Sequence, residues 1–390
     1  MDATLEPISI TGLGAFSLLG TDFMSVCRAY SHPRHGLIRK RIGEEEVWVG
    51  AIPDELRSRV DQLKEERPDY GELDDSVLFA ILASREAVRA AGWGTEDAFG
   101  INIGSSRGAT GLTEACHREY METGRVPALA SPGSTLGNIS SWVAQDLGCR
   151  GPELSHSITC STALHAVLNA MAWLRSGMAE RMLAGGSEAP LTPFTIAQMQ
   201  ALKIYSREIG TYPCRALDPE KENNSLVLGE AAASACLETG IKQQCLAVIR
   251  GAGYATEALT HAVSLSAEAT CLQASMRMAL ENVRPSEVDA VVMHAPGTLK
   301  GDRAERAAVR RVFGSANPVL TSTKWKTGHT FGASGMLSLE LAVCMLQSRR
   351  AVLPPYLKPE GASRPIRRVL VNAVGFGGNA VSLLLGGPED

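Results

Sequence analysis

Cys160 stands where a reactive thiol would be expected. It follows a short extended run of Ser, Ile and Thr and precedes an apolar pattern of helical spacing, so it marks the start of a helix. Backbone N–H groups and the positive end of the helix dipole favour a thiolate there, and the same N–H groups can stabilise an oxyanion on an attacked thioester. A cysteine in such a segment is also commonly a buried, inert small hydrophobe. The pattern therefore needs support from other residues.

Two histidines and an aromatic residue occur later in the chain, at points where strands should end. His294 closes an apolar run and opens a loop with Pro and Gly, and His329 lies among small residues. Phe376 is flanked by glycines after a further strand-like run. Loops at strand ends are where the active sites of α/β proteins gather, although each residue alone is compatible with a structural role.

Short β-branched runs bounded by glycine alternate with longer helical patterns, which indicates an α/β protein with covered sheets. The helix from Ser161 is the best defined, since apolar residues recur at helical spacing until Gly177. Two halves packed as one body, 1–240 and 241–390, fit this pattern better than two free domains. The sequence predicts strands at 8–11, 98–103, 181–184, 247–251, 290–294 and 369–374, and helices at 76–91, 161–176, 266–281, 303–313 and 335–347.

Composition excludes several classes of function. The 390 residues are 45% hydrophobic. With 38 basic and 42 acidic residues the net charge is −4, so the chain lacks the excess of positive charge that nucleic-acid binding requires. We see neither a secretory signal nor an apolar stretch of about 18 residues, so we expect a cytoplasmic protein with no membrane partner. Nine cysteines without metal-like spacing predict mostly reduced, buried thiols and no metal site.

The order of these features resembles the β-ketoacyl-acyl-carrier-protein synthase family along nearly the whole chain. Further blocks agree with the family: Gly-Gly-Ser-Glu188, Cys214-Arg-Ala-Leu-Asp218 and Leu-Gly-Glu230. The resemblance implies a thiolase-like α/β fold, with two similar halves forming a five-layered αβαβα core, and a dimer. A degradative thiolase would carry a second late cysteine, and the ketoacyl-synthase-III class an asparagine in place of His329. The class with one Cys and two His is left.

The resemblance also implies a mechanism. Cys160 would take an acyl chain from acyl carrier protein, with the N–H groups of Cys160 and Phe376 holding the oxyanion, and Phe376 gating the pocket. His294 and His329, as neutral imidazoles, would stabilise the enolate formed when malonyl carrier protein loses carbon dioxide. No metal or organic cofactor is implied. Three more residues would have supporting roles: Lys324 and Glu305 as an ion pair that organises the histidines, and Thr298 as a contact of the phosphopantetheine arm.

The sequence departs from the family pattern at several places. Pro296 and Asn379 replace or displace hydroxyl groups expected around the phosphopantetheine arm, and the segment Asp218 to Asn224 lacks its usual glycine and aromatic. Gly71 and Glu72 stand where a basic pair would meet an acidic carrier. These changes point toward specialised type II polyketide or polyene synthesis, and fatty-acid synthesis stays open as the pathway.

Three functions therefore stay open. The first is a catalytic ketosynthase, as a homodimer or a heterodimer with a second ketosynthase-like chain. The second is a chain-length-factor-like partner with little catalysis of its own, and the third an acyltransferase or hydrolase that uses Cys160 without condensation. Residues 107–122 are expected at the dimer interface. Four basic residues could contact an acidic carrier or simply form a solvated face: Arg57, Arg59, Lys64 and Arg67.

Overall fold

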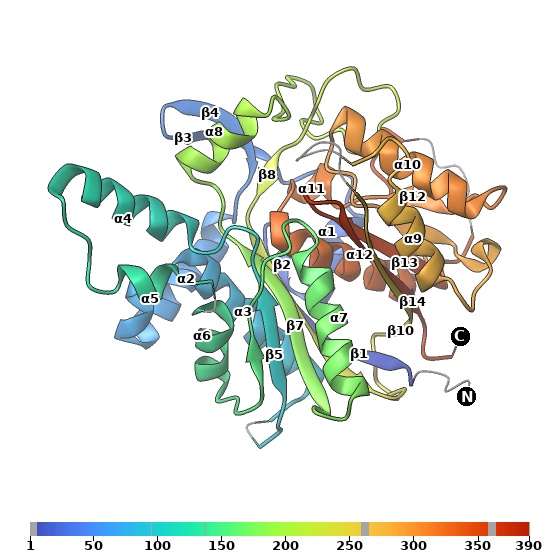
Figure 1. Ribbon diagram of the computed structural model, residues 1–390, viewed down its shortest axis with the longest axis horizontal. Coiled ribbons are helices and arrows are strands. Elements are labelled where there is room, and N and C mark those ends of the chain that lie inside the picture. The colour runs from blue at the N-terminus through green and yellow to red at the C-terminus, as the bar shows by residue number, and fades with distance from the viewer. Residues whose placement is uncertain (1–5, 95, 137, 259–264, 358–363, 390) are drawn as a thin grey trace.

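Two large β-sheets form the frame of the protein (Figure 1), which we describe from a computed structural model covering residues 6–94, 96–136, 138–258, 265–357 and 364–389. A six-stranded sheet has the order β2-β1-β9-β7-β5-β6, and a five-stranded sheet the order β10-β14-β13-β11-β12. The first comprises β1 (Ile8–Ser17), β2 (Gly20–Asp22), β5 (Gly100–Gly104), β6 (Glu153–Leu154), β7 (Arg181–Glu188) and β9 (Ala231–Thr239). The second comprises β10 (Ala247–Thr256), β11 (Ala290–Val292), β12 (Val319–Thr321), β13 (Arg368–Val374) and β14 (Asn379–Gly386).

Helices cover both faces of each sheet. Helix α3 (Asp75–Ala91) packs on the outer face of the six-stranded sheet, and α9 (Thr270–Ala279) on the outer face of the five-stranded sheet. Between the sheets lie α7 (Thr162–Arg175) and α12 (Ser334–Ser348), which contact each other. The result is five layers, helix–sheet–helix–sheet–helix, as the resemblance implied.

The remaining elements decorate this frame. A small third sheet has the order β3-β4-β8. Its strands are β3 (Ile38–Ile42), β4 (Glu45–Gly50) and β8 (Leu228–Gly229), and the other helices are α1 (Phe23–Ser31), α2 (Asp54–Glu66), α4 (Thr110–Thr123), α5 (Ala130–Ser134), α6 (Asn138–Leu147), α8 (Pro193–Ala201), α10 (Leu299–Phe313) and α11 (Lys324–Thr327). Three short 3₁₀ turns occupy Pro68–Glu72, Pro285–Glu287 and Phe331–Ala333.

Local sequence explains the main helices. Asp74 caps α3 by accepting the Ser76 N–H at 2.9 Å, and Gly92 ends that helix at φ +69°, a conformation that costs glycine little. Helix α12 is mostly apolar and is buried on every side from Ser334 to Leu346, which is the pattern of a helix with no solvent face. It lies in the central layer for that reason, and its side chains join those of α7 and of both sheets in one core cluster.

The predicted strands and helices are all present, with ends that differ by a few residues. The largest differences are at β1, β7 and β10, which extend well beyond the predicted ends, and at two helix starts: α9 begins at Thr270 rather than 266, and α10 at Leu299 rather than 303. Two long strands, β9 and β14, were missed, as were the short strands and the helices outside the predicted ranges. Strand β9 is a run of alanines from Ala231, a residue with little strand preference of its own, and pairing with β1 and β7 makes it a strand. The division at residue 240 stays a prediction.

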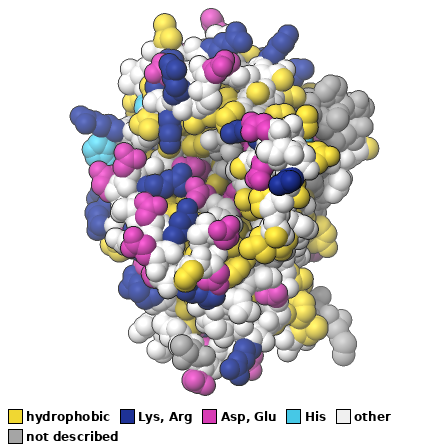
Figure 2. Space-filling view, turned by 90° about the vertical axis from the view of Figure 1, so that its left-hand side faces the viewer, with side chains coloured by type: hydrophobic (Ala, Val, Ile, Leu, Met, Phe, Trp, Pro, Cys, Tyr) yellow, Lys and Arg dark blue, Asp and Glu magenta, His cyan; other side chains and the backbone are white. Residues whose placement is uncertain are grey.

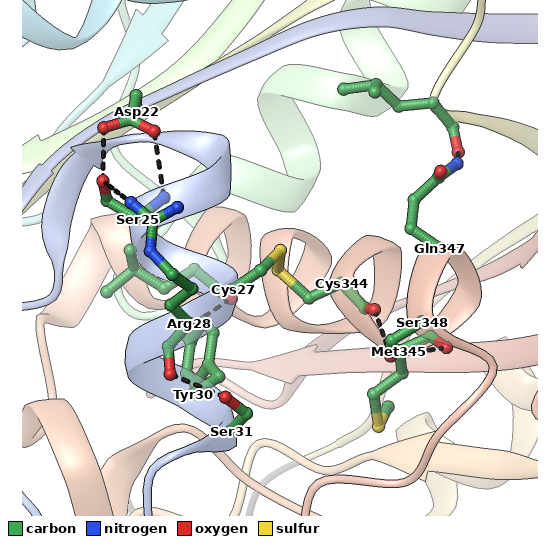
Figure 3. Close-up of a disulfide and its surroundings, with 12 residues drawn as sticks. Asp22, Ser25, Cys27, Arg28, Tyr30, Ser31, Cys344, Met345, Gln347 and Ser348 are labelled. Atoms are coloured by element: carbon green, nitrogen blue, oxygen red, sulfur yellow. Dashed lines mark hydrogen bonds between the residues drawn. A yellow bond between two sulfur atoms is a disulfide. The ribbon is translucent and has the colours of Figure 1, made fainter.

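Most cysteines are free, as expected, but one disulfide and one long apolar segment were not expected from composition. Cys27 and Cys344 form a disulfide that joins α1 to α12 across a sequence separation of 317 (Figure 3), whereas the other seven cysteines are free. The segment Phe331–Ser348 is long and apolar enough by composition to cross a membrane, with a mean hydropathy of 1.2, although the sequence reading found no such stretch. Because 89% of it is buried inside the protein, it is a core helix.

Helices α4 and α5 project from the body as an arm (Figure 1). Helix α4 has no buried residue, and four large hydrophobic side chains on the arm are more than half exposed: Tyr120, Met121, Val126 and Leu129. The face of the molecule on this side mixes hydrophobic and charged side chains (Figure 2). An arm that exposes large hydrophobic side chains among charged ones and buries none of the residues of α4 suits contact with another chain.

Candidate active site

Cys160 lies in a tight turn just before α7. Thr159 has φ +47°, a left-handed conformation that is unusual for a β-branched residue. The turn is secured by the hydroxyl of Thr162, which donates to the Thr159 carbonyl at 2.6 Å, and by Thr159 Oγ1, which donates to the Phe376 carbonyl at 3.2 Å. The turn thus carries the thiol into a cavity, where it is 5% exposed.

Both histidines reach the same cavity from the C-terminal half. His294 follows β11, and His329 follows α11. His329 Nε2 lies 3.2 Å from Cys160 Sγ, and the two imidazole rings meet edge to face with centroids 5.2 Å apart. One ligand atom from each of the three residues lies within 4.8 Å of the others. The expected convergence of Cys160, His294 and His329 is therefore present.

Burial keeps this group of three uncharged. It lowers the pKa of His329 to about 3 and that of His294 well below its usual range, and the charge of Lys324 pushes both further down. Burial also raises the pKa of the Cys160 thiol to about 12. Glu188 adds to that rise, and the positive charge of Lys324 opposes it.

This result corrects the expectation of a resting thiolate. Burial outweighs the helix start, so the thiol keeps its proton at neutral pH. The proton must then leave as the sulfur attacks, and His329 Nε2 is in position to accept it. Cys160, His294 and His329 could also be considered as metal ligands, but a neutral thiol must lose its proton before it binds a cation well.

Ser334 completes the environment of His329, and the sequence reading missed it. Its hydroxyl lies 2.8 Å from His329 Nδ1 and accepts the Thr330 N–H at 3.1 Å. A hydroxyl can donate or accept, so this partner suits either tautomer of the imidazole. The available signal was a hydroxyl five residues after the histidine in a run of small residues.

Glu305 and Lys324 are both buried, but they do not form the expected ion pair. Glu305 accepts the backbone N–H of His294 at 2.9 Å and of Ala295 at 2.8 Å. Lys324 Nζ instead donates to Ser338 Oγ at 3.3 Å, and in the described parts of the chain no salt bridge joins it to Glu305. Burial raises the pKa of Glu305 to about 7 and lowers that of Lys324 to about 8. Glu305 thus fixes the loop of His294, and Lys324 acts through its charge.

The cavity above Cys160 has a volume of about 440 Å³ and includes Thr298 and Phe376 in its wall. Thr298 caps α10 by accepting the Gly301 N–H at 3.2 Å, and Phe376 is 38% exposed. Gly375 passes so close to the turn of Cys160 that an added Cβ would meet Thr159 Oγ1 at 1.9 Å. The Phe376 loop and the nucleophile turn are therefore packed without spare room.

Asn379, which departs from the family pattern, ties this loop to α7. Its Oδ1 accepts from Ser161 Oγ at 2.6 Å, and its Nδ2 donates to the Phe376 carbonyl at 3.3 Å. The substitution removes a hydroxyl but supplies a bridge between the two halves of the chain. Sequence reasoning treated it only as a loss.

The basic residues considered for carrier binding lie near α2, away from the cavity residues. Arg57 pairs with Asp75 at 2.6 Å and Arg67 with Asp69 at 2.6 Å, so much of the charge is already compensated. Arg59 donates to Thr21 Oγ1 at 2.9 Å. This arrangement favours a solvated charged face over a carrier site.

Comparison with known proteins assigns the family. Residues 28–242 match the model of the β-ketoacyl synthase N-terminal domain, and residues 246–359 that of the C-terminal domain. Nodulation protein E of Rhizobium sp. (strain N33) is 30% identical, over 96% of this chain and 98% of its own.

Solved structures agree on the fold. A type II polyketide ketosynthase, solved in complex with its acyl-carrier protein, is 22% identical with a TM-score of 0.84 over 98% of this chain and 99% of its own. The ishigamide ketosynthase/chain length factor is 20% identical with a TM-score of 0.85 over the same shares. The fold is thus thiolase-like, and the chain belongs to the β-ketoacyl synthase family of acyltransferase-type condensing enzymes.

Proposed function

We propose that this chain is a β-ketoacyl-acyl-carrier-protein synthase in which Cys160 carries the growing acyl chain and His294 and His329 serve the condensation. The observation that carries the proposal is the 3.2 Å approach of His329 Nε2 to Cys160 Sγ, with His294 facing the same cavity. A chain without catalysis would have no need to keep three buried, uncharged reactive groups in contact.

In the first half-reaction, Cys160 Sγ attacks the thioester carbonyl of acyl carrier protein as its proton passes to His329 Nε2. The tetrahedral oxyanion is held by the backbone N–H groups of Cys160 and Phe376. It collapses when the carbon–sulfur bond to the phosphopantetheine breaks, and the departing sulfur takes the proton from His329. The acyl group is then bonded to Cys160, and both imidazoles are neutral again.

In the second half-reaction, malonyl carrier protein enters the same cavity past Phe376 and Thr298. The two imidazoles, at this stage protonated on the nitrogen that faces the substrate, donate hydrogen bonds to the thioester oxygen as carbon dioxide leaves. The low pKa values of His294 and His329 keep them neutral donors at pH 7. The carbanion attacks the Cys160 thioester, the carbon–sulfur bond to Cys160 breaks, and the released thiolate takes up a proton from solvent. The product is longer by two carbons. Loss of the carboxylate drives the step, so it calls for no metal or organic cofactor.

The second candidate is a chain-length-factor-like subunit, and one observation favours it. Pro296 lines the cavity where a hydroxyl would otherwise contact the phosphopantetheine arm. Against it, Asn379 supports the Phe376 loop rather than leaving it loose. In either case we propose a dimer, with itself or with a second synthase-like chain, that uses the exposed arm of α4 and α5.

We also propose a cytoplasmic location, with polyketide or fatty-acid synthesis as the pathway. The disulfide between Cys27 and Cys344 is the observation that counts against this location, because disulfides are rare in the cytoplasm, where glutathione keeps thiols reduced. Its redox state in the purified native protein is therefore an informative measurement.

The test is acylation followed by condensation. Purified protein is mixed with acyl carrier protein loaded with acetyl, hexanoyl or decanoyl groups, and intact mass reports transfer. We expect an adduct on the wild type and on Cys116→Ser, a control cysteine on the arm, but none on Cys160→Ser. Malonyl carrier protein should then yield a β-ketoacyl product, and His294→Ala should stop this step only. Absence of any adduct, alone or with a co-expressed second chain, would leave only the partner role.

A further inference from the structure

A cation lies beyond the inner wall of the cavity, outside the machinery described above. Phe331 forms part of that wall, 5.5 Å from the His329 ring between centroids, and is buried in one apolar cluster with Cys160. Over its ring, with the guanidinium carbon 5.4 Å from the centroid, lies Arg107. The charge of Arg107 reaches Cys160, where it favours the ionised thiol.

The guanidinium of Arg107 has neutral hydrogen-bond partners, whereas its backbone N–H is accepted by the Glu188 carboxylate. Its Nη2 donates to the Gln198 side-chain oxygen and, at 3.5 Å, to Thr195 Oγ1, both on α8. Within the described ranges no carboxylate lies at ion-pairing distance from Arg107. Two acids lie near this residue in the fold or along the chain: Glu188 accepts the backbone N–H groups of Ser106, Arg107 and Gly332, and Glu114 accepts from Thr192.

Such a group is unusual next to an acyl-binding wall. An alkyl chain gains nothing from a half-buried guanidinium and would have to desolvate it. A carboxylate gains a charge-assisted and potentially bidentate hydrogen bond there, because the planar guanidinium fork matches its two oxygens. Gln198 and Thr195 hold that fork from the α8 side.

We propose that Arg107 is a specificity-determining residue that selects short acyl groups ending in a carboxylate, bound as the thioester on Cys160 with the far end turned past Phe331. The inference rests on the proposed function, since it concerns the acyl group that Cys160 carries. Loading is the same exchange: the acyl–sulfur bond moves from the carrier to Cys160, and the carrier thiol takes the proton.

The experiment uses two probes of matched shape. Glutaryl and 5-methylhexanoyl thioesters of pantetheine differ in a terminal carboxylate against an isopropyl group, and acetyl is too short to reach Arg107. Rates of adduct formation on Cys160 are read by intact mass. Because a hydrogen bond to a charged group exceeds a neutral contact by a clear margin, we expect glutaryl to load at least about tenfold faster than 5-methylhexanoyl.

Variants at Arg107 should reverse this order. Arg107→Leu should lose the glutaryl preference and gain 5-methylhexanoyl loading, with each rate divided by the acetyl rate of the same variant so that any change in the reactivity of Cys160 cancels. Arg107→Gln keeps a polar side chain beside Gln198 but lacks the charge, so it should lose the glutaryl preference too. This variant replaces the leucine variant if thermal melting shows that the leucine variant folds poorly. Arg150→Leu, an exposed arginine elsewhere, is the matched control and should behave as the wild type.

Two results would overturn the inference. One is a wild type that loads acetyl readily but does not prefer glutaryl, or keeps its preference in Arg107→Leu. The other is a variant whose selectivity is unchanged but whose dimer dissociates in native mass spectrometry, which would assign Arg107 to the partner chain. Failure of acetyl to load on Cys160 of the wild type is different: it refutes the proposed function itself.

Discussion

Glu305 offers the sharpest test of how this site is held, because it lies in the cavity wall and fixes the loop of His294 through backbone hydrogen bonds. Its carboxylate is 1% exposed and accepts the N–H groups of His294 and Ala295, and Asn372 Nδ2 donates to it at 3.2 Å. Ala295 has φ +23°, an unfavourable conformation for alanine that these hydrogen bonds help to hold. Replacement of Glu305 should therefore move His294 and leave Cys160 in place.

The magnitude follows from the two buried donors. In Glu305→Ala, each N–H left without a partner costs about 1–3 kcal/mol. Loss of a buried carboxyl offsets part of this, since the rise of its pKa to about 7 reports a real cost of burial. We expect the free energy of unfolding to fall by about 2–4 kcal/mol, and by about half as much in Glu305→Gln, which keeps one acceptor.

The two half-reactions should respond differently to the replacement of Glu305. Acyl transfer to Cys160 depends on His329 and should stay within about threefold of the wild type, whereas decarboxylation of malonyl carrier protein depends on His294 and should fall about 10- to 100-fold. The assays are urea unfolding, intact mass for acylation, and release of carbon dioxide. Glu340→Gln is the control, a buried glutamate of α12 outside the site. Equal loss of both half-reactions, or an unchanged decarboxylation rate, would refute the reasoning.

Three further outcomes are expected. His329 has a folded pKa of about 3, below its ordinary 6.5, so its contribution to stability is complete above pH 6.5 and is lost as the pH falls toward 3. Between pH 7 and 5, His329→Gln should therefore lose less unfolding free energy than the wild type. Equal losses in the two proteins would contradict this. Gly375→Ala should cut acylation at least about tenfold with an unchanged helical circular dichroism signal, because its Cβ would displace Thr159; wild-type rates would mean that the turn can yield. Cys27→Ser should lower the unfolding free energy by about 2–4 kcal/mol in oxidising buffer and by much less in dithiothreitol. A native wild type in which intact mass shows both thiols reduced would contradict this.

Much of the site could be predicted because each part has a local signature. Cys160 is followed by a helical pattern, and His294 ends an apolar run, so their positions at element ends needed no tertiary information. The contacts between them could not be predicted in the same way. Ser334 beside His329 and Ser338 beside Lys324 are short polar side chains of a buried helix, and only the packing of α12 brings them to these partners.

The charge states of the site residues were the other property that the sequence did not predict. The start of α7 favours a thiolate by its local dipole, but the balance depends on how much water the folded chain removes from Cys160 and on which charges surround it. The ion pair expected from Lys324 and Glu305 failed for a similar reason, since nearer partners satisfied each of them first. The same holds for Cys27 and Cys344, whose pairing across 317 residues no spacing could indicate.

The sequence by itself indicated most strands of the two large sheets, the family that the chain resembles and the three candidate site residues, because periodicity, caps and short motifs are local. Only the tertiary structure decided which charges are carried and which groups touch: the neutral thiol of Cys160, the partner of His329, the bridge from Asn379 and the cation over Phe331. Burial and side-chain contacts arise only when segments far apart in the sequence pack together, so local sequence cannot predict them.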